Sequence, residues 1–371
     1  MSLHTLVRPR HSYDIDGMAR IGSDIRLPEL EFFRSNPSAT YDIVVGIGVV
    51  GAITPRLKRG ISTSATTLVY GEQLGGVFAN FSIDFGNPLI VTVAPMLALS
   101  PHVVYTNIIE PLLRFVLAAN GKVLLHAACV ASAGVTVMLS AKTDTGKTST
   151  VLTMLHQGSG TFYSDDMLIV DERGIASRYP KPLTISAHTL RAVPQHRLKL
   201  SQRVALVWQS RLHSRSGRAA GKRLGAANLP IMAMNAAVQF LVPPPKFRIT
   251  DLVSCEIGGQ VRMQNLFIIE RGSPASVEPV GIDVALEELL ANTEDAYGFP
   301  PYSQLAPYIV VHGETHAQLR AREREVLGSA MRGIEVTRIR VPDYTWAQRM
   351  QVLTSARQQE ITEQEVRERT A

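Results

Sequence analysis

The chain has 371 residues, of which 45% are hydrophobic and 19% charged, and this composition excludes a disordered chain or a fibrous repeat. The formal net charge of +6 at pH 7 favours an anionic partner, such as a nucleotide or a phosphorylated substrate. No DNA- or RNA-reading module is recognisable in the sequence, so nucleic acid is not the expected partner.

The cysteine content and the apolar runs indicate the compartment. Only Cys129 and Cys255 are present, far apart in the sequence, which is typical of reduced thiols in the cytosol and excludes a metal site built from cysteines. Residues 1–10 lack the continuous apolar segment of a signal peptide. The apolar runs 42–53 and 89–99 are shorter than the ~20 residues of a membrane-spanning helix. The sequence therefore predicts a cytoplasmic protein without a transmembrane segment.

The first part of the chain is expected to be rich in β-structure. Residues 1–40 are polar and contain scattered prolines, which predicts a surface arm or covering segment. Three β-prone segments follow at residues 41–45, 66–70 and 77–85, and the third alternates apolar with polar side chains. These patterns predict an N-terminal β-rich domain over residues 1–110, with one face of its sheet exposed to water.

A helix and a hairpin are expected next. The helix is predicted to begin at Pro101 and to end at Asn120-Gly121, with Pro111 kinking or splitting it. Two apolar segments, 123–130 and 135–139, flank a short glycine-containing turn. They predict a β-hairpin whose second strand runs into the central motif of the sequence.

That motif extends from Leu139 to Ser149 and is typical of a P-loop, because an apolar strand precedes it and a helical pattern follows it. Its backbone N–H groups and the start of the helix are expected to cradle a polyphosphate. Lys147 is expected to reach the terminal phosphates and Thr148 to bind Mg²⁺. Ala141 replaces the first glycine of the pattern, so that corner must form with ordinary dihedral angles. The predicted nucleotide-binding residues of the loop are Lys142, Thr143, Asp144, Thr145, Gly146, Lys147, Thr148 and Ser149.

Two carboxylates and a histidine are candidates for the chemistry. Asp165 and Asp166 follow the β-prone run 161–164. Such a pair alone is usually a solvated turn, but its position one strand beyond a P-loop helix predicts a site for a metal ion and a general base. A histidine in an apolar strand is usually a core residue, and the nearby P-loop makes His126 a catalytic candidate as well.

The segments 125–128, 141–149 and 164–166, together with the hairpin, resemble the HPr kinase/phosphorylase family in order and spacing. This P-loop kinase family is related in architecture to phosphoenolpyruvate carboxykinase. The resemblance covers about residues 121–190 and implies a mixed α/β fold with a P-loop kinase core. The family signature that accompanies HPr recognition is not found, so the acceptor is not expected to be HPr.

The resemblance also implies roles for the candidate residues. Asp165 would be the general base toward the acceptor hydroxyl, Asp166 would bind Mg²⁺, and His126 would orient the base. The catalytic domain implied in this way spans residues 111–280.

One unbalanced run of basic residues follows the Asp pair. No acidic residue occurs from Ser210 to Asn235, whereas glycines separate several arginines and lysines. A glycine-hinged basic loop could close over the γ-phosphate, with Arg215 and Arg218 contacting the nucleotide. A solvated basic loop and a patch for an anionic acceptor are the alternatives.

The remainder, residues 281–371, is expected to form a C-terminal α/β extension. A strand is predicted over residues 266–272, a helix from Asp283, a charged helix around residues 320–324 and a last strand over residues 334–341.

The sequence thus predicts an ATP- and Mg²⁺-dependent kinase that transfers the γ-phosphoryl group to a hydroxyl. The acceptor is a serine of a protein or peptide, or a small alcohol such as a sugar or cyclitol. A non-catalytic nucleotide-binding regulatory or assembly protein is the alternative, and a carboxykinase-like lyase is a weaker one. The sequence is also compatible with a homo-oligomer.

Overall fold

The computed structural model describes residues 9–50, 59–74, 76–132, 134–143, 145–156, 160–184, 230–241, 246–297 and 301–355. The chain forms two compact units, each assembled from separate segments. Unit 1 contains the described parts of residues 1–124, 200–246 and 296–326, and unit 2 those of residues 125–199, 247–295 and 327–371. The consecutive domains predicted as 1–110, 111–280 and 281–371 differ from this grouping, because the C-terminal region contributes to both units.

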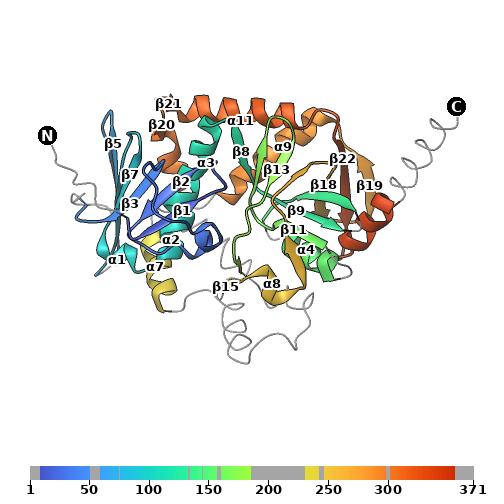
Figure 1. Cartoon of the computed structure of the whole chain (residues 1–371), viewed down its shortest axis with the longest axis horizontal. Coiled ribbons are helices and arrows are strands. Elements are labelled where there is room, and N and C mark those ends of the chain that lie inside the picture. Colours follow the sequence, from blue (N-terminus) through green and yellow to red (C-terminus); the bar gives the residue numbers. More distant parts are fainter. Residues whose placement is uncertain are drawn as a thin grey trace. The chain divides into compact units, whose positions relative to one another are not determined.

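Unit 1 is built on a mixed sheet with the strand order β1-β2-β3-β7-β6-β5-β4 (Figure 1). Its strands are β1 (His11–Asp14), β2 (Arg20–Ser23), β3 (Ile43–Ile47), β4 (Arg59–Thr63), β5 (Thr67–Leu74), β6 (Val77–Asp84) and β7 (Leu89–Val93). β2, β3 and β7 pair in parallel, and the other neighbours pair antiparallel. In β6, Phe81 and Ile83 are buried whereas Ser82 and Asp84 are partly exposed, which confirms the predicted alternation.

The prediction of a surface arm over residues 1–40 is wrong for the described residues 9–40. β1 and β2 are strands of the sheet, and Tyr13, Ile21 and Leu27 are buried in the core of unit 1. Each of these strands has four residues, which is too short for an alternating apolar pattern to stand out in the sequence.

Unit 1 also contains helices. They are η1 (Pro28–Phe33), α1 (Pro95–Ala98), α2 (Pro101–Val104), η2 (Tyr105–Ile109), α3 (Glu110–Ala119), α7 (Ile231–Leu241), α10 (Tyr302–Leu305) and η5 (Ala306–Tyr308). The predicted helix from Pro101 to Asn120 is confirmed as α2, η2 and α3 in sequence. It contains a π-helical segment over η2, which ends two residues before Pro111, and the missing N–H of this proline interrupts regular helical bonding. α7 packs on β5 and β6, and the short strands β20 (Val310–Val311) and β21 (Glu314–Thr315) pair with each other.

Unit 2 is built on a second mixed sheet with the strand order β16-β11-β9-β10-β18-β22-β19. Its strands are β9 (Ala127–Ser132), β10 (Val135–Ser140), β11 (Gly160–Ser164), β16 (Cys255–Ile257), β18 (Asn265–Arg271), β19 (Ser276–Pro279) and β22 (Glu335–Val341). β9 and β10 form the predicted antiparallel hairpin, and the predicted strands at residues 266–272 and 334–341 are confirmed as β18 and β22.

The strand directions of this sheet determine where its loops meet. β10, β18 and β22 are parallel, and β11 runs the same way because both β10 and β11 pair antiparallel with β9. The carboxyl ends of these four strands therefore lie at one edge of the sheet, which is where ligands bind in parallel α/β sheets.

The remaining elements of unit 2 surround this sheet. α4 (Lys147–His156) packs against β9 and β11 through Val151, Leu152 and Leu155, which are buried. β12 (Leu168–Asp171), β13 (Ile175–Ser177) and β17 (Gln260–Arg262) pair antiparallel in that order. The other elements are β14 (Leu183–Thr184), β15 (Lys246–Phe247) and α8 (Ile249–Leu252). The boundaries between the two units fall within β8 (Lys122–Leu125), β15, α11 (His316–Ala330) and the end of α9 (Ile282–Ala296).

The fold is mixed α/β, as the sequence predicts. None of the helices in the described part of the chain combines the length and the apolar character that crossing a membrane would require.

Candidate functional site

The P-loop sequence leaves the sheet at the carboxyl end of β10 and enters α4 at Lys147. Ala141 is buried and has an ordinary negative φ, as expected for the residue that replaces the first glycine. Gly146, directly before the helix, has a φ of +131°. Only glycine adopts that conformation without strain, so the second glycine of the motif is needed for the backbone path.

Lys147 begins the helix and is buried. Its Nζ donates to the backbone carbonyl of Asp166 at 3.3 Å, so the first residue of α4 is already tied to the loop after β11. Burial lowers the pKa of Lys147 to about 8, although the negative charges of Asp166 and Asp165 oppose this shift. The ammonium group is therefore a desolvated cation at the start of a helix, where an anion would stabilise it.

Asp165 follows β11 and faces the P-loop helix. The Thr148 hydroxyl donates to its Oδ2 at 2.8 Å. Its Oδ1 is buried and accepts no hydrogen bond from any described residue. Burial raises the pKa of Asp165 to about 6, against the lowering effect of Lys147. Oδ2 of Asp165 thus accepts a hydrogen bond from a hydroxyl. Oδ1 lacks a partner among the described residues, and a cation or a water molecule would satisfy it.

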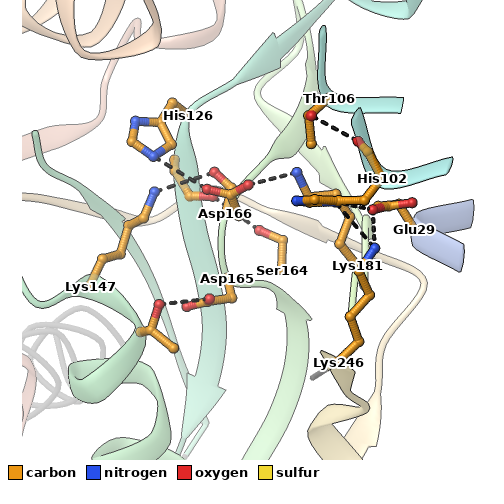
Figure 2. A network of polar contacts seen from close by, with 12 residues as sticks. Glu29, His102, Thr106, His126, Lys147, Ser164, Asp165, Asp166, Lys181 and Lys246 are labelled. Atoms are coloured by element: carbon orange, nitrogen blue, oxygen red, sulfur yellow. Dashed lines mark hydrogen bonds and ion pairs between the residues drawn. The ribbon is translucent and has the colours of Figure 1, made fainter. Parts of the chain in front are cut away.

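Asp166 lies in a different environment, although it is the next residue. Its side chain is 46% exposed, and its Oδ2 lies 2.6 Å from Lys181 Nζ. Its Oδ1 lies 3.4 Å from His126 Nε2. Partial burial acts to raise the pKa of Asp166, but Lys181, His126 and Lys147 outweigh this effect and hold it well below its usual range. Figure 2 shows the His126, Lys147 and Lys181 side chains converging on Asp166.

His126 occupies the break between β8 and β9 and is buried. Its Nδ1 lies 3.1 Å from the carbonyl oxygen of Asn292, so Nδ1 carries a proton and Nε2 is the nitrogen that faces Asp166. The His126 backbone N–H donates to Thr293 Oγ1 at 3.2 Å. Burial and the positive charge of Lys147 lower the pKa of His126, whereas Asp166 acts in the opposite direction.

α9 supports both the histidine and the P-loop. Besides accepting from His126, Asn292 donates through Nδ2 to Ser140 Oγ at 3.1 Å, at the end of β10. The Thr143 backbone N–H donates to Asp295 Oδ2 at 3.4 Å. One face of α9 therefore holds the His126 imidazole and two positions of the P-loop segment, Ser140 and Thr143.

The structure brings together all three predicted catalytic residues and two residues of the predicted loop. Lys147, Thr148, Asp165, Asp166 and His126 form one connected group. Lys142 and Thr143 are exposed, Thr145 Oγ1 donates to the Lys142 carbonyl, and Ser149 Oγ donates to the Gly146 carbonyl. The predicted residues Asp144, Arg215 and Arg218 lie outside the described residues.

The contacts within the group differ from the expected roles. His126 was expected to orient Asp165, but the carboxylate within its reach is that of Asp166. Asp165 instead contacts Thr148, the residue expected to bind Mg²⁺. The sequence could not assign these partners, because adjacent residues after a strand point to opposite sides and the side facing the helix depends on the tertiary fold.

Three residues that contact this group have no functional signal in the sequence. Lys181 reaches Asp166 from the segment before β14, and a lone lysine in a loop is usually a solvated charge. Asn292 and Thr293 lie within an ordinary amphipathic helix. Their roles follow only from the packing of α9 against the sheet.

A Mg²⁺ ion fits this donor set. No group of three or more His, Cys, Asp or Glu residues able to hold a metal is found among the described residues. Mg²⁺ in nucleotide sites needs only one or two protein oxygens, because substrate phosphates and water complete its octahedron. The Thr148 hydroxyl and the unpartnered Oδ1 of Asp165 supply oxygens of that kind.

The candidate site thus combines a buried lysine, a hydroxyl, two carboxylates of different exposure and an imidazole at one edge of the unit 2 sheet. No protein-family model matches the sequence, and no curated protein matches it.

Proposed function

We propose that unit 2 is an ATP-dependent phosphotransferase that transfers the γ-phosphoryl group to a hydroxyl acceptor. The observation that carries this proposal is the connected group of Lys147, Thr148, Asp165, Asp166 and His126 at the carboxyl edge of the sheet. A phosphate-cradling loop, a hydroxyl-carboxylate pair and an exposed carboxylate held by cations are the parts that phosphoryl transfer needs.

The phosphates bind at the P-loop. The first backbone N–H groups of α4, which begins at Lys147, and the positive end of its helix dipole favour negative charge. Lys147 moves from the carbonyl oxygen of Asp166 to the terminal phosphates, and the phosphates compensate the burial that lowers its pKa. ATP binding therefore supplies the anion that this desolvated lysine lacks.

Thr148 and Asp165 hold the Mg²⁺ ion. The hydrogen bond between Thr148 Oγ1 and Asp165 Oδ2 keeps both oxygens beside α4. Asp165 Oδ1 is the buried acceptor that a cation would satisfy. When bound, Mg²⁺ neutralises charge on the β- and γ-phosphates. The contacts thus favour Asp165, in place of Asp166, as the metal ligand.

Asp166 faces the acceptor. It is the more exposed carboxylate, and Lys181, 2.6 Å from its Oδ2, keeps it ionised at neutral pH and fixes its orientation. As the acceptor oxygen forms its bond to the γ-phosphorus, the bond from that phosphorus to the β,γ-bridging oxygen breaks and ADP leaves. The proton of the acceptor hydroxyl passes to an Asp166 carboxylate oxygen.

The two aspartates give the test of this proposal. We expect Asp166→Asn to lower kcat by about 10²- to 10⁴-fold with little change in Mg·ATP affinity, because only the base is lost. Asp165→Asn should instead raise the Mg²⁺ concentration needed for half-maximal rate. Phosphate release from labelled ATP, and transfer to a panel of protein and small-molecule hydroxyl acceptors, are the measurements. Glu172→Gln, an exposed acid of the same unit, is the matched control.

Binding provides the complementary measurement. Lys147→Ala should weaken Mg·ATP binding about 10- to 150-fold in titration calorimetry, because a charge-assisted hydrogen bond of about 1.5–3 kcal/mol is removed. Tight binding without any phosphate release or transfer would instead favour the non-catalytic nucleotide-binding alternative. Absence of Mg·ATP binding by the unaltered protein would contradict both.

A further inference from the structure

An aromatic side chain lies directly against the P-loop. Gly146 is so close to Tyr344 that a Cβ placed on the glycine would lie 3.0 Å from the ring carbon Cδ1. The same Cβ would lie 3.0 Å from Trp346 Cζ3. Tyr344 therefore touches the residue that precedes the phosphate-binding Lys147, although almost 200 positions separate the two in sequence.

The sheet topology explains why these residues meet. β18 and β22 are parallel to β10, so Arg271 at the end of β18 and the segment after Val341 at the end of β22 lie at the same edge as the P-loop. Tyr344 and Trp346 belong to that segment. A nucleotide whose phosphates lie on the loop shares this edge with them.

Several contacts hold the Tyr344 ring in place. Arg271 Cζ lies 4.9 Å from the ring centroid, and Arg271 Nη1 donates to the Tyr344 hydroxyl at 3.1 Å. Trp346 packs edge-on against the ring with 5.5 Å between centroids. Trp346 is itself buried, and its Nε1 donates to the carbonyl oxygen of Glu270 at 3.2 Å.

Tyr344 nevertheless remains 36% exposed. A large aromatic ring that is fixed by a buried tryptophan and an arginine, yet open to solvent in part, is pre-organised for stacking. Arg271 adds a planar cation to the same surface, and a cation there favours the binding of an electron-rich ring.

We propose that Tyr344, supported by Arg271, is the platform on which the nucleobase of the bound nucleotide stacks. The inference rests on the proposed nucleotide site and adds to it the residue that binds the base, which is the part of the ligand that a bare polyphosphate lacks. Stacking uses the π-face that every base has, so the platform accepts both ATP and GTP. Tyr344 contributes affinity through the base, whereas Lys147 contributes through the phosphates.

The experiment compares Mg·ATP, Mg·GTP and inorganic tripolyphosphate with Mg²⁺ by titration calorimetry on the full chain. Tripolyphosphate carries the phosphates without a base, so it isolates the contribution of Tyr344. We expect Tyr344→Ala and Tyr344→Leu to weaken ATP and GTP binding by about 5- to 150-fold, the range that corresponds to loss of base–aromatic stacking. Tripolyphosphate binding should change less than about 2-fold, and Tyr344→Phe should retain ATP binding.

Three controls separate the outcomes. Tyr344→Leu keeps an apolar side chain against Gly146, so it shows whether any loss comes from a collapsed loop. Tyr308→Ala removes an exposed tyrosine from unit 1 and should leave both ligands unaffected. Lys147→Ala should weaken ATP and tripolyphosphate alike.

Equal weakening of ATP and tripolyphosphate by both Tyr344→Ala and Tyr344→Leu would overturn the platform while leaving the phosphate site in place. Unchanged ATP binding in those variants would overturn it as well. If the unaltered protein bound tripolyphosphate but gained nothing from the base, the platform alone would be wrong. Failure of the unaltered protein to bind either ligand would overturn the nucleotide site itself.

Discussion

At the scale of single residues, the environment and not the residue type separates the two adjacent aspartates. Asp165 is buried beside Thr148, which raises its pKa to about 6, whereas Asp166 is half-exposed and Lys181 and His126 help to hold its pKa well below its usual range despite partial burial. Pairs of acids whose environments move their pKa values apart have different roles in known active sites. This difference is the reason for assigning the metal to one aspartate and the acceptor to the other.

A second buried carboxylate, Glu29 in unit 1, yields a prediction about pH. It contacts His102 Nδ1 and Lys246 Nζ (Figure 2). Burial alone would raise its pKa, but these two partners lower it from 4.5 to about 2. A carboxylate with a lowered pKa stabilises the folded state above its unfolded value, and this stabilisation is lost as the pH falls from about 4.5 toward about 2.

We therefore expect the free energy of unfolding to fall more steeply between pH 5 and pH 3 in the unaltered protein than in Glu29→Gln. The full difference across the transition is about 3 kcal/mol, from 1.36 kcal/mol for each pKa unit. Urea unfolding followed by circular dichroism at pH 5, 4, 3 and 2 measures it. Parallel pH profiles for the two proteins would show that Glu29 does not contribute in this way.

At the scale of elements, β1 and β2 extend the unit 1 sheet beyond what the sequence predicts. Ile21 in β2 is fully buried and pairs in register with Ile43 of β3, whereas the neighbouring Arg20 is exposed. A short strand of this kind is stabilised by the sheet it joins and not by its own propensity.

This placement gives a matched pair of substitutions. Ile21→Ala should lower the free energy of unfolding by about 2–5 kcal/mol, because it removes a buried side chain and leaves a cavity. Arg20→Ala should cost no more than about 1 kcal/mol, since its ion pair with Asp14 is exposed. Chemical denaturation of both variants compares them directly. Equal, small effects would mean that β2 is not part of the core.

At the scale of the whole molecule, each unit is assembled from segments that are distant in sequence. In unit 1, Arg114 on α3 and Glu323 on α11 are both fully buried and form a bidentate ion pair at 2.6 and 2.9 Å. Tyr302 accepts a further hydrogen bond from Arg114 at 3.2 Å. The pair joins the first and the last segments of this unit.

Breaking this pair should be costly. Glu323→Gln leaves a buried arginine without its counter-charge, so we expect a loss of about 3–5 kcal/mol in the free energy of unfolding. Glu325→Gln, an exposed acid on the same helix, is the control and should change stability by less than about 0.5 kcal/mol. Urea denaturation midpoints of the two variants test the difference. A loss equal to that of the control would contradict the structural role of the pair.

The sequence by itself determined the local parts of this protein. The hairpin of β9 and β10, the P-loop with α4 behind it and the position of Asp165 and Asp166 after a strand all follow from patterns within a few residues of each other. Apolar periodicity and turn chemistry report such local structure directly.

Only the tertiary structure decided which of these parts meet and what else joins them. The approach of His126 to Asp166, the roles of Lys181 and α9, and the contact of Tyr344 with Gly146 depend on strand order and on helix packing. Periodicity shows which face of an element is apolar, but it does not show which distant element covers that face. Strand order is selected by the combined packing of the whole sheet, so residues far apart in sequence acquire their roles only once the sheet is formed.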